Sequence, residues 1–446
     1  MQVTVVGLGY VGLVTAACLA RLGQDVIGLE SDESKLAVLD AGQIPYFEPG
    51  LDAEVQTQLA GRRLRFTKDP ATALAGPDAV LICVGTPSDA AGRADLRFVL
   101  DVADTIAERV EGRPVIALRS TVPVGTTRRV ERRLAESLRR RGIDEGLAII
   151  SNPEFLRTGR AIDDFLRPTR IVLGRTSRAT DADIARLRGL YQSLDAPMII
   201  TDAESAELVK NAANAFLATK VSFVNELAQL CDATGASIDD VMAGVSADPR
   251  IGGDYFRPGL GYGGSCLPKD VRSLIAMGIE HGQAMALAKA VDEVNREQAT
   301  RYARALEGAL GGDLTGKRVA ILGLAFKPET DDIRDSPSLS LARAIRDRGA
   351  QVVGCDPEAT ERVRRSEAWL EIAETPLEAA RDADAVVLGT EWPAYVTLDA
   401  RSLAAAMRGR VFVDGRGAAD PVAIRAAGLD YRALGRPSIE ASTASS

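Results

Sequence analysis

The amino-acid sequence predicts an α/β protein with two Rossmann-like, doubly wound domains joined by a long central helix and a helical middle domain. A strand, a glycine-rich turn, a helix and a second strand follow one another over residues 2–30, and a similar alternation restarts at residue 318. Between them, residues 204–231 keep a helical pattern without glycine or proline. We expect an N-terminal domain at 1–200, a central domain at 201–310, a C-terminal domain at 311–436, and a disordered polar tail at 437–446.

The first strand leads into a turn that reads Gly7-Leu8-Gly9-Tyr10-Val11-Gly12. In such a turn Gly7 permits the tight bend, Gly9 lets a pyrophosphate approach the helix N-terminus, and Gly12 lets the helix pack on the strand. Glu30 follows the second strand, where its carboxylate would accept hydrogen bonds from ribose hydroxyls and repel a 2′-phosphate. The pattern therefore predicts a site for NAD rather than NADP.

Three later strands, predicted at 79–84, 115–118 and 148–150, each end in a polar turn. These turns carry Thr86, Thr121 and Glu154. Because open α/β sheets bind ligands beyond the carboxyl ends of their strands, we expect the three side chains to line one crevice. Simple loop capping is the alternative for any one of them taken singly.

The central helix has a broad apolar surface, which is typical of an interdomain spine and a subunit interface. It predicts a homodimer or a higher homo-oligomer. Within the helix Lys210 and Asn214 stand four residues apart on one face, so both can reach a common ligand. A solvated helix face is the alternative for this pair.

Residues 259–270 place Cys266 after a run with four glycines and before Lys269 and Asp270. Glycine lets a ligand approach the backbone closely, and the thiol is the strongest nucleophile among ordinary side chains near neutral pH. His281 is the single histidine, so chemistry built on a histidine base is disfavoured. The loop therefore indicates nucleophilic chemistry at Cys266.

The composition narrows the class of protein. The chain has 54 Lys and Arg against 62 Asp and Glu, a net charge of −8, so we expect no nucleic-acid partner. The five cysteines lack CxxC spacing, which disfavours a disulfide scaffold or a metal site and fits a reducing cytoplasm. No basic segment precedes the apolar N-terminus, so we expect no membrane insertion.

The second α/β unit is predicted with strands at 318–323, 351–354, 385–388 and 411–413 and a helix at 338–348. Its first turn reads Gly323-Leu324-Ala325-Phe326-Lys327, with one glycine and no GxGxxG. We therefore expect this unit to bind phosphate differently from the first. Two such units predict two nucleotide ligands, one for each.

Motifs along the chain resemble those of the nucleotide-sugar 6-dehydrogenases from residue 1 to about 436. In order they are Gly7-x-Gly9-x-x-Gly12, Ser120 to Thr126, Asn152 to Leu156, Lys210-x-x-x-Asn214, Gly263 to Asp270, and Asp414-Gly415-Arg416. The segments at 163–165 and 390–392 resemble the UDP-glucose branch more than the GDP-mannose branch. The resemblance implies a four-electron oxidation of UDP-glucose to UDP-glucuronate with two NAD in succession. GDP-mannose or a UDP-N-acetylhexosamine as substrate, and a non-catalytic sensor of NAD or nucleotide sugars, are the alternatives.

The residues fit that chemistry. Lys210, Asn214 and Asp270 are available to relay the proton of the sugar hydroxyl and to hold its oxygen. Attack by Cys266 on the resulting aldehyde gives a thiohemiacetal, and its oxidation yields a thioester. By resemblance, Glu154 is the candidate base for thioester hydrolysis and Thr121 a positioning group.

The resemblance also implies which residues bind each ligand. For NAD it adds Tyr10, Val11, Lys35, Thr86, Thr121, Lys269 and Arg334 to the glycines and Glu30. For the sugar nucleotide it implies Glu154, Phe155, Leu156, Lys210, Asn214, Tyr255, Arg257, Gly263, Lys327 and Arg416, with Arg250 inserted into the neighbouring subunit's site. Thr158 stands where the family commonly has glutamate, so a second acidic group is missing. Cys18, Cys83, Cys231 and Cys355 lie in apolar contexts and are expected to be inert packing residues.

Overall fold

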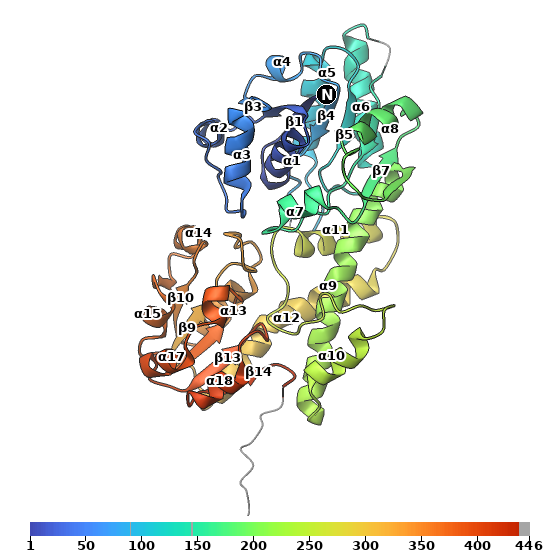
Figure 1. The fold of residues 1–446 in the computed structure, drawn as a ribbon. Helices are drawn as coiled ribbons and strands as arrows, with labels where there is room; N and C mark the ends of the chain where they lie inside the picture. The colour runs from blue at the N-terminus through green and yellow to red at the C-terminus, as the bar shows by residue number, and fades with distance from the viewer. Residues whose placement is uncertain (90, 144–145, 437–446) are drawn as a thin grey trace, which may run out of the picture. The chain divides into compact units, whose positions relative to one another are not determined.

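The computed structural model describes residues 1–89, 91–143 and 146–436, so the tail predicted to be disordered lies outside the described residues. The chain divides into two compact units. The first unit comprises Met1–Ala213 and Ser273–Ala284, and the second comprises Asn214–Arg272 and the residues from Met285 onward. Each unit contains a sheet flanked by helices (Figure 1), which confirms the predicted fold class.

An eight-stranded sheet forms the centre of the first unit, in the order β3-β2-β1-β4-β5-β6-β7-β8. Neighbouring strands are parallel except β6 and β7, which pair antiparallel. The strands are β1 (Gln2–Val6), β2 (Asp25–Leu29), β3 (Leu64–Thr67), β4 (Ala79–Ile82), β5 (Val115–Leu118), β6 (Ile149–Ser151), β7 (Ile171–Arg175) and β8 (Met198–Asp202). The helices between them are α1 (Tyr10–Arg21), α2 (Glu33–Asp40), α3 (Leu51–Ala60), α4 (Pro70–Ala73), α5 (Arg97–Arg109), α6 (Thr126–Arg140), α7 (Ala161–Leu166) and α8 (Asp181–Gly189).

The middle strand β4 of this sheet is apolar on both faces because helices cover both. In β4, Leu81 belongs to one hydrophobic core while Val80 and Ile82 belong to the other. This alternation is the two-residue period of a strand between two helical layers. The strand order changes direction between β1 and β4, so the turns after these strands diverge and leave room for a ligand.

A six-stranded parallel sheet forms the centre of the second unit, in the order β11-β10-β9-β12-β13-β14. The strands are β9 (Arg318–Leu322), β10 (Gln351–Cys355), β11 (Glu371–Ile372), β12 (Ala385–Leu388), β13 (Val411–Asp414) and β14 (Asp430–Ala433). The helices that accompany them are α13 (Pro337–Arg346), α14 (Thr360–Ser366), α15 (Pro376–Ala380), α16 (Pro393–Val396), α17 (Ala400–Ala406) and α18 (Pro421–Ala426). The order around β9 and β12 repeats that around β1 and β4.

Four helices lie between the two sheets in the sequence. They are α9 (Ala203–Thr234), α10 (Ile238–Ser246), α11 (Leu267–Glu280) and α12 (Ala286–Ala309). The border between the units falls inside α9 and again inside α11, so each of these helices contributes to both units. In the described part of the chain, no helix is long and apolar enough to cross a membrane.

Candidate active site

In the glycine turn after β1, neighbouring atoms leave no room for a side chain at Gly7 and Gly12, whereas the space beside Gly9 is empty. Gly7 has φ +87°, and a Cβ on Gly12 would lie 1.8 Å from the carbonyl oxygen of Gly7. A Cβ on Gly9 would meet no atom within 4 Å. Because α1 begins at Tyr10, the open position lies at a helix N-terminus, where free N–H groups favour an anion. The turn thus fits a dinucleotide phosphate.

Glu30 is buried at the end of β2 and is held in place from several sides. Its carboxylate accepts hydrogen bonds from Leu8 N and Ser31 N at 3.0 Å, and Lys35 Nζ lies 2.8 Å away. The two residues predicted to contact NAD at this end of the site are therefore paired with each other. The carboxylate is fixed where the sequence predicts a ribose hydroxyl.

Tyr10 is tied to a buried carboxylate that the sequence analysis missed. Its phenol donates to Glu48 Oε2 at 2.5 Å, and Glu48 also accepts from Gly159 N and Ala161 N at 2.5 and 2.7 Å. Burial, followed by the charge of Glu48, raises the pKa of Tyr10. Thr158 is also hydrogen-bonded to Tyr10. Glu48 precedes a Pro-Gly turn, and no local signal in the sequence connects it to residues so far along the chain.

Thr86 and Thr121, predicted to line one crevice, are in contact. Thr86 Oγ1 donates to the carbonyl oxygen of Thr121 at 2.7 Å. The loop that continues from Thr121 is anchored by Glu207, whose buried carboxylate accepts from Gly125 N and Thr127 N at 2.6 Å. Burial raises the pKa of Glu207, although these donors favour its ionised form. The sequence did not lead us to Glu207 either. The available signal was that this glutamate lies on the apolar side of the predicted helix.

Lys210 and Glu154 form a buried ion pair in the first unit. Lys210 Nζ lies 3.1 Å from Glu154 Oε1, and the two side chains are 4% and 5% exposed. Leu156 N donates to the other carboxylate oxygen at 2.5 Å, and the ammonium lies 5.5 Å from the centre of the Phe155 ring. Four residues predicted to bind the sugar nucleotide are thus brought together. Two buried charges are tolerated here because each has a partner of opposite sign.

Asn214 and Asp270 meet in the second unit. Asn214 Nδ2 donates to Asp270 Oδ2 at 2.6 Å, and Lys269 Nζ lies 2.6 Å from Oδ1. Because each carboxylate oxygen has a partner, the carboxylate of Asp270 is oriented. The side chain is also buried, since Asp270 is 1% exposed. An oriented carboxylate next to an amide can hold a hydroxyl group and accept its proton.

Cys266 stands at the N-terminus of α11. Its carbonyl oxygen accepts from Asp270 N at 2.9 Å, and its Sγ lies 3.6 Å from Ser265 Oγ. The positive charge of Arg334 also interacts with the Cys266 thiol. The hydrogen bond between Arg334 and Asp332 raises the pKa of the Arg334 guanidinium. A helix N-terminus and a nearby guanidinium are the surroundings that favour a thiolate.

The other cysteines differ from Cys266 in exposure. Cys18, Cys83, Cys231 and Cys355 are buried, as predicted, whereas Cys266 is partly accessible. Burial raises the pKa of Cys18 and Cys83 to about 12. Within residues 1–89, 91–143 and 146–436, no cluster of His, Cys, Asp and Glu could hold a metal ion.

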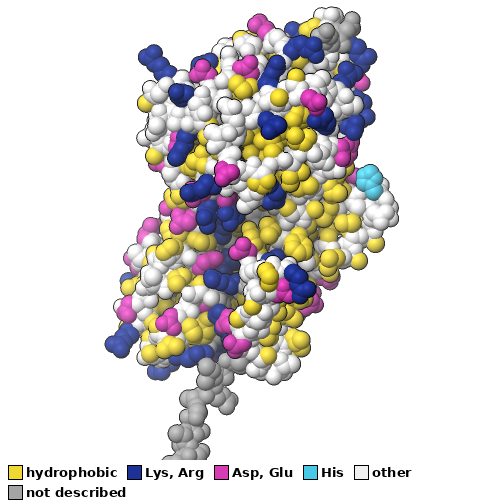
Figure 2. Space-filling model, turned by 45° about the vertical axis from the view of Figure 1, so that its right-hand side comes forward, with side chains coloured by type: hydrophobic (Ala, Val, Ile, Leu, Met, Phe, Trp, Pro, Cys, Tyr) yellow, Lys and Arg dark blue, Asp and Glu magenta, His cyan; other side chains and the backbone are white. Residues whose placement is uncertain are grey.

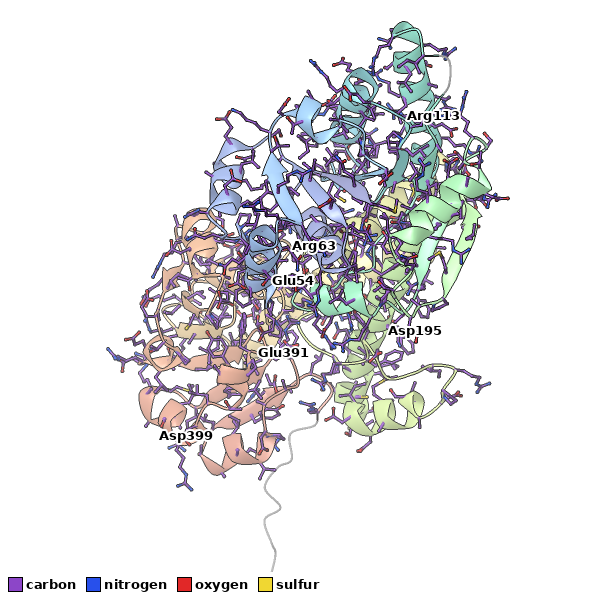
Figure 3. All side chains as sticks on the ribbon, turned by 45° about the horizontal axis from the view of Figure 1, so that its top comes forward. Glu54, Arg63, Arg113, Asp195, Glu391 and Asp399 are labelled. Carbon is purple, nitrogen blue, oxygen red and sulfur yellow. The ribbon has the colours of Figure 1, made fainter. Side chains whose placement is uncertain are left out.

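Two predicted phosphate ligands lie in loops of the second sheet. Lys327 Nζ lies 5.6 Å from the centre of the Phe326 ring. Arg416 donates to the carbonyl oxygens of Gly389, at 2.8 Å, and Gly261, at 3.2 Å, and to that of Phe326. Glu391, labelled in Figure 3, has its Oε2 3.2 Å from Arg416 Nε. Arg416 therefore joins three loops of the second unit.

Three further predicted residues lie in one loop between α10 and α11. The side chain of Arg250 is 86% exposed and pairs with Asp248 at 2.5 Å. Arg257 is exposed, and Tyr255 adopts a positive φ of 66°, which is rare for an aromatic residue. Strained backbone of this kind concentrates at ligand-binding segments.

Comparison with known proteins agrees with this geometry over nearly the whole chain. Three models of the UDP-glucose/GDP-mannose dehydrogenase family match: the NAD binding domain at residues 1–195, the central domain at 204–297 and the UDP binding domain at 320–421. A UDP-glucose 6-dehydrogenase of Rhizobium meliloti (strain 1021) is 43% identical, covering 98% of this chain and 100% of the relative.

Comparison with solved structures indicates the same family. A UDP-glucose dehydrogenase from Pyrobaculum islandicum is 40% identical with a TM-score of 0.89, covering 97% of each chain. A UDP-D-ManNAc dehydrogenase from Pyrococcus horikoshii is 26% identical with a TM-score of 0.85, covering 98% of this chain and 99% of that one. The chain therefore belongs to the UDP-glucose/GDP-mannose dehydrogenase family, and it is an oxidoreductase with that family's NAD-binding and UDP-binding domains.

Proposed function

We propose that this enzyme oxidises UDP-glucose to UDP-glucuronate in two NAD-dependent steps, with Cys266 holding the sugar covalently between them. The observation that carries the proposal is the place of Cys266 at the N-terminus of α11, one turn before Asp270 and the Asn214 amide. A nucleophile so close to an oriented carboxylate suits an alcohol that must become an aldehyde and then an acid.

The first oxidation requires loss of the proton on the C6 hydroxyl of the sugar. Asp270 accepts that proton, directly or through a water, while Asn214 and Lys210 hold the oxygen. Bound NAD supplies the hydride acceptor in each of the two oxidations. The product of this step is an aldehyde at C6.

The Cys266 thiolate then adds to the aldehyde carbon. A carbon–sulfur bond forms, and the carbonyl oxygen takes a proton to give a thiohemiacetal. Loss of the remaining C6 hydride and of the hydroxyl proton leaves a thioester. Lys210 stabilises the negative charge that develops on the oxygen in the addition.

Hydrolysis of the thioester completes the reaction. Water adds to the carbonyl carbon, Glu154 takes the water proton, and the carbon–sulfur bond breaks to return the thiolate. The balance is one UDP-glucose, two NAD⁺ and one water giving one UDP-glucuronate, two NADH and three protons. Release of Glu154 from its pair with Lys210 is part of this step, because a base held by a cation is a weak base.

For NAD we propose the turn glycines with Tyr10 and Val11, the Glu30–Lys35 pair, Thr86 and Thr121, and Lys269 with Arg334. The space beside Gly9 and the anchored Glu30 carboxylate support this assignment. For the sugar nucleotide we propose Glu154 to Leu156, Lys210 and Asn214, the loop with Arg250, Tyr255, Arg257 and Gly263, and the pair Lys327 and Arg416. We also propose domain borders near residues 200 and 310.

The choice of UDP-glucose rests on the relatives. Identity is 43% to a UDP-glucose 6-dehydrogenase and 40% to a solved UDP-glucose dehydrogenase, against 26% to a UDP-D-ManNAc dehydrogenase. GDP-mannose and UDP-N-acetylhexosamines are the alternatives to be measured. The missing glutamate at Thr158 does not remove the base, because Glu154 is present and oriented by Leu156 N.

We further propose a homodimer or higher homo-oligomer built on α9. Phe216, Phe223 and Leu230 recur every seven residues along this helix and are 66%, 47% and 59% exposed. Hydrophobic side chains are visible on the surface that Figure 2 brings forward. A stripe at this spacing is the surface one helix offers another. The five cysteines without disulfides support a reducing, cytoplasmic location.

The test is a count of NADH formed per sugar consumed, with UDP-glucose, GDP-mannose and UDP-N-acetylmannosamine as separate substrates. We expect two NADH per UDP-glucose and slower turnover of the others. Cys266→Ser is expected to stop after the first oxidation or to accumulate a trapped adduct, whereas Cys231→Ala, at a buried packing position, keeps the ratio of two. Full four-electron turnover by Cys266→Ser would refute the covalent role.

A further inference from the structure

The loop that carries Cys266 is held on one side by two asparagines of the central helices. Gly259 N donates to Asn225 Oδ1 at 2.8 Å. Asn295, in the middle of α12, makes two bonds to one residue: its Oδ1 accepts from Tyr262 N at 2.8 Å, and its Nδ2 donates to Tyr262 O at 3.0 Å. A primary amide is the side chain that can accept from the backbone N–H and donate to the backbone carbonyl of the same residue.

The second sheet holds the same loop on its other side. Leu260 N donates to the Gly415 carbonyl at 2.9 Å, and Gly264 N donates to the Arg334 carbonyl at 2.8 Å. Arg416 adds a bond to Gly261 O at 3.2 Å. The loop is therefore bonded to α9 at Gly259, to α12 at Tyr262 and to loops of the second sheet at Leu260, Gly261 and Gly264, all within one compact unit.

The glycines of the loop are required by these contacts. A Cβ on Gly261 would lie 2.4 Å from Asn295 Oδ1, one on Gly263 would lie 2.3 Å from the Asp335 carbonyl oxygen, and one on Gly264 would lie 2.7 Å from the Phe326 ring. Gly261 and Gly264 also have positive φ. The close approach that the sequence attributed to a ligand is made, at these three positions, by the protein itself.

We propose that Asn295 is a positioning residue for Cys266. By fixing both polar groups of Tyr262, it sets the path of the four residues that follow to the thiol, and so the place of the sulfur at the N-terminus of α11 and near Arg334. The inference rests on the proposed role of Cys266 as the nucleophile. Asn295 touches neither the thiol nor any group of the clusters around Lys210 and Asp270, and it acts through the backbone alone.

The charged groups that face the thiol explain why its position matters. Arg334 acts on it from the loop after β9, and the Lys269–Asp270 pair lies one turn along α11. Asp332 holds Arg334 in place through a bidentate pair. If the loop moves, the sulfur loses the guanidinium and the helix N-terminus, the two surroundings that favour a thiolate.

The experiment measures alkylation of Cys266 by iodoacetamide as a function of pH, followed by mass spectrometry of the Cys266 peptide. Asn295→Ala removes both bonds to Tyr262. Asn295→Asp keeps the acceptor and loses the donor. Glu293→Ala, at an exposed position on the same helix, is the matched control. We expect the alkylation midpoint to rise in the order control, Asp, Ala, with the rate near neutral pH falling about threefold for each half-unit rise.

Turnover and folding provide the second readout. We expect kcat to fall with alkylation while the KM for UDP-glucose stays within about twofold, because Asn295 bonds to Tyr262 and to none of the side chains proposed for the sugar nucleotide. If Asn295→Ala fails to fold, by circular dichroism and thermal unfolding, the isosteric Asp variant decides. An unchanged or lowered alkylation midpoint in a folded Asn295 variant overturns the proposal. Alkylation needs no substrate, so this outcome is independent of whether Cys266→Ser retains turnover.

Discussion

The turn after the first strand of each sheet, β1 in the first unit and β9 in the second, has the same backbone arrangement. Each places a glycine of positive φ after its first strand, Gly7 at +87° and Gly323 at +97°. Each follows its second strand with an acidic residue that accepts from the turn: Leu8 N bonds to Glu30, and Leu324 N bonds to Asp356 at 2.7 Å. The same steric and hydrogen-bonding requirements are met twice.

The turns differ in what fills them. In the first unit α1 starts at Tyr10, and the position beside Gly9 is open. In the second unit α13 starts only at Pro337, and Ala325, which follows Gly323 by two residues as Gly9 follows Gly7, is 0% exposed. The first turn leaves room for a phosphate against the backbone, and the second is occupied by the chain's own atoms.

This contrast suggests how one fold can be adapted to the NAD-binding and the UDP-binding domain. A turn that leads directly into a helix offers its amides to a dinucleotide. A turn followed by a long loop does not offer those amides but adds side chains, here Lys327, which we propose for the sugar nucleotide. That loop also supplies the carbonyl that holds Gly264 beside Cys266. Under the proposed function, the second unit binds the sugar nucleotide with side chains, and its loop also holds the loop that carries Cys266.

The largest effect is expected from Gly12→Ala, which closes the first turn. The new Cβ would lie 1.8 Å from the Gly7 carbonyl oxygen, so the helix must move away from the strand. We expect a loss of about 1–3 kcal/mol in unfolding free energy and of measurable NAD binding. Denaturant unfolding and calorimetric titration check the two effects. Gly308→Ala, in α12 with no atom within 4 Å, should leave both intact or raise stability slightly.

Gly9→Ala separates ligand binding from folding. Its φ of −66° suits alanine and nothing lies within 4 Å, so the unfolding midpoint should not change. The methyl group occupies the phosphate space, and the Kd for NAD should rise by about ten- to a hundredfold. The mirror variant Ala325→Gly, in the second turn, should leave the Kd for NAD unaltered. A normal NAD affinity in Gly9→Ala would mean that the phosphate does not approach this backbone.

The two acidic residues should respond in different ways to removal of charge. Glu30→Gln removes the charge that would repel a 2′-phosphate, so the NADP-to-NAD ratio of kcat/KM should rise about tenfold, which corresponds to about 1.4 kcal/mol. Asp356→Asn leaves buried amide donors poorly paired and should cost about 1–3 kcal/mol of stability. If Asp356→Asn changed cofactor choice, the separation of roles between the units would be wrong.

The smallest effect is expected from Arg416→Lys. Lysine keeps the charge but cannot donate to three carbonyl oxygens in a planar fork. We expect a loss of about 1 kcal/mol in stability and a Kd for UDP that rises a few fold, measured by calorimetry. Arg432→Lys, at an exposed pair on β14, serves as the reference. Equal effects in the two variants would show that the geometry of Arg416 has no special part in the second unit.

Local patterns predicted the strands and the first turn well. The strand at 25–29 and the strand at 115–118 have the predicted bounds, and α9 extends the predicted helix by a few residues at its ends. These elements depend on neighbours in sequence: β-branched runs, a glycine turn, and an apolar face without breakers. The antiparallel pairing of β6 with β7 depends on residues far apart and has no local signature.

In the candidate site too, local patterns identified residues but not the long-range contacts between them. The sequence identified Lys210 and Glu154, but their pairing follows from the sheet order that brings the loop after β6 to α9. Glu48, Glu207 and Asn295 were missed because each acts on backbone amides or carbonyls of remote segments. A side chain that binds backbone leaves no pattern of partner side chains to recognise.

The division of the chain has a consequence for synthesis. The first unit needs residues 273–284, which emerge from the ribosome only after the segment 214–272 of the second unit. Val124 N, for example, finds its acceptor in Met277, 153 positions later. The nascent N-terminal sheet must therefore wait, with part of its surface uncovered, until well over half the chain has been made. We therefore expect translation speed and chaperone access across residues 214–284 to affect how much of this enzyme reaches its native state.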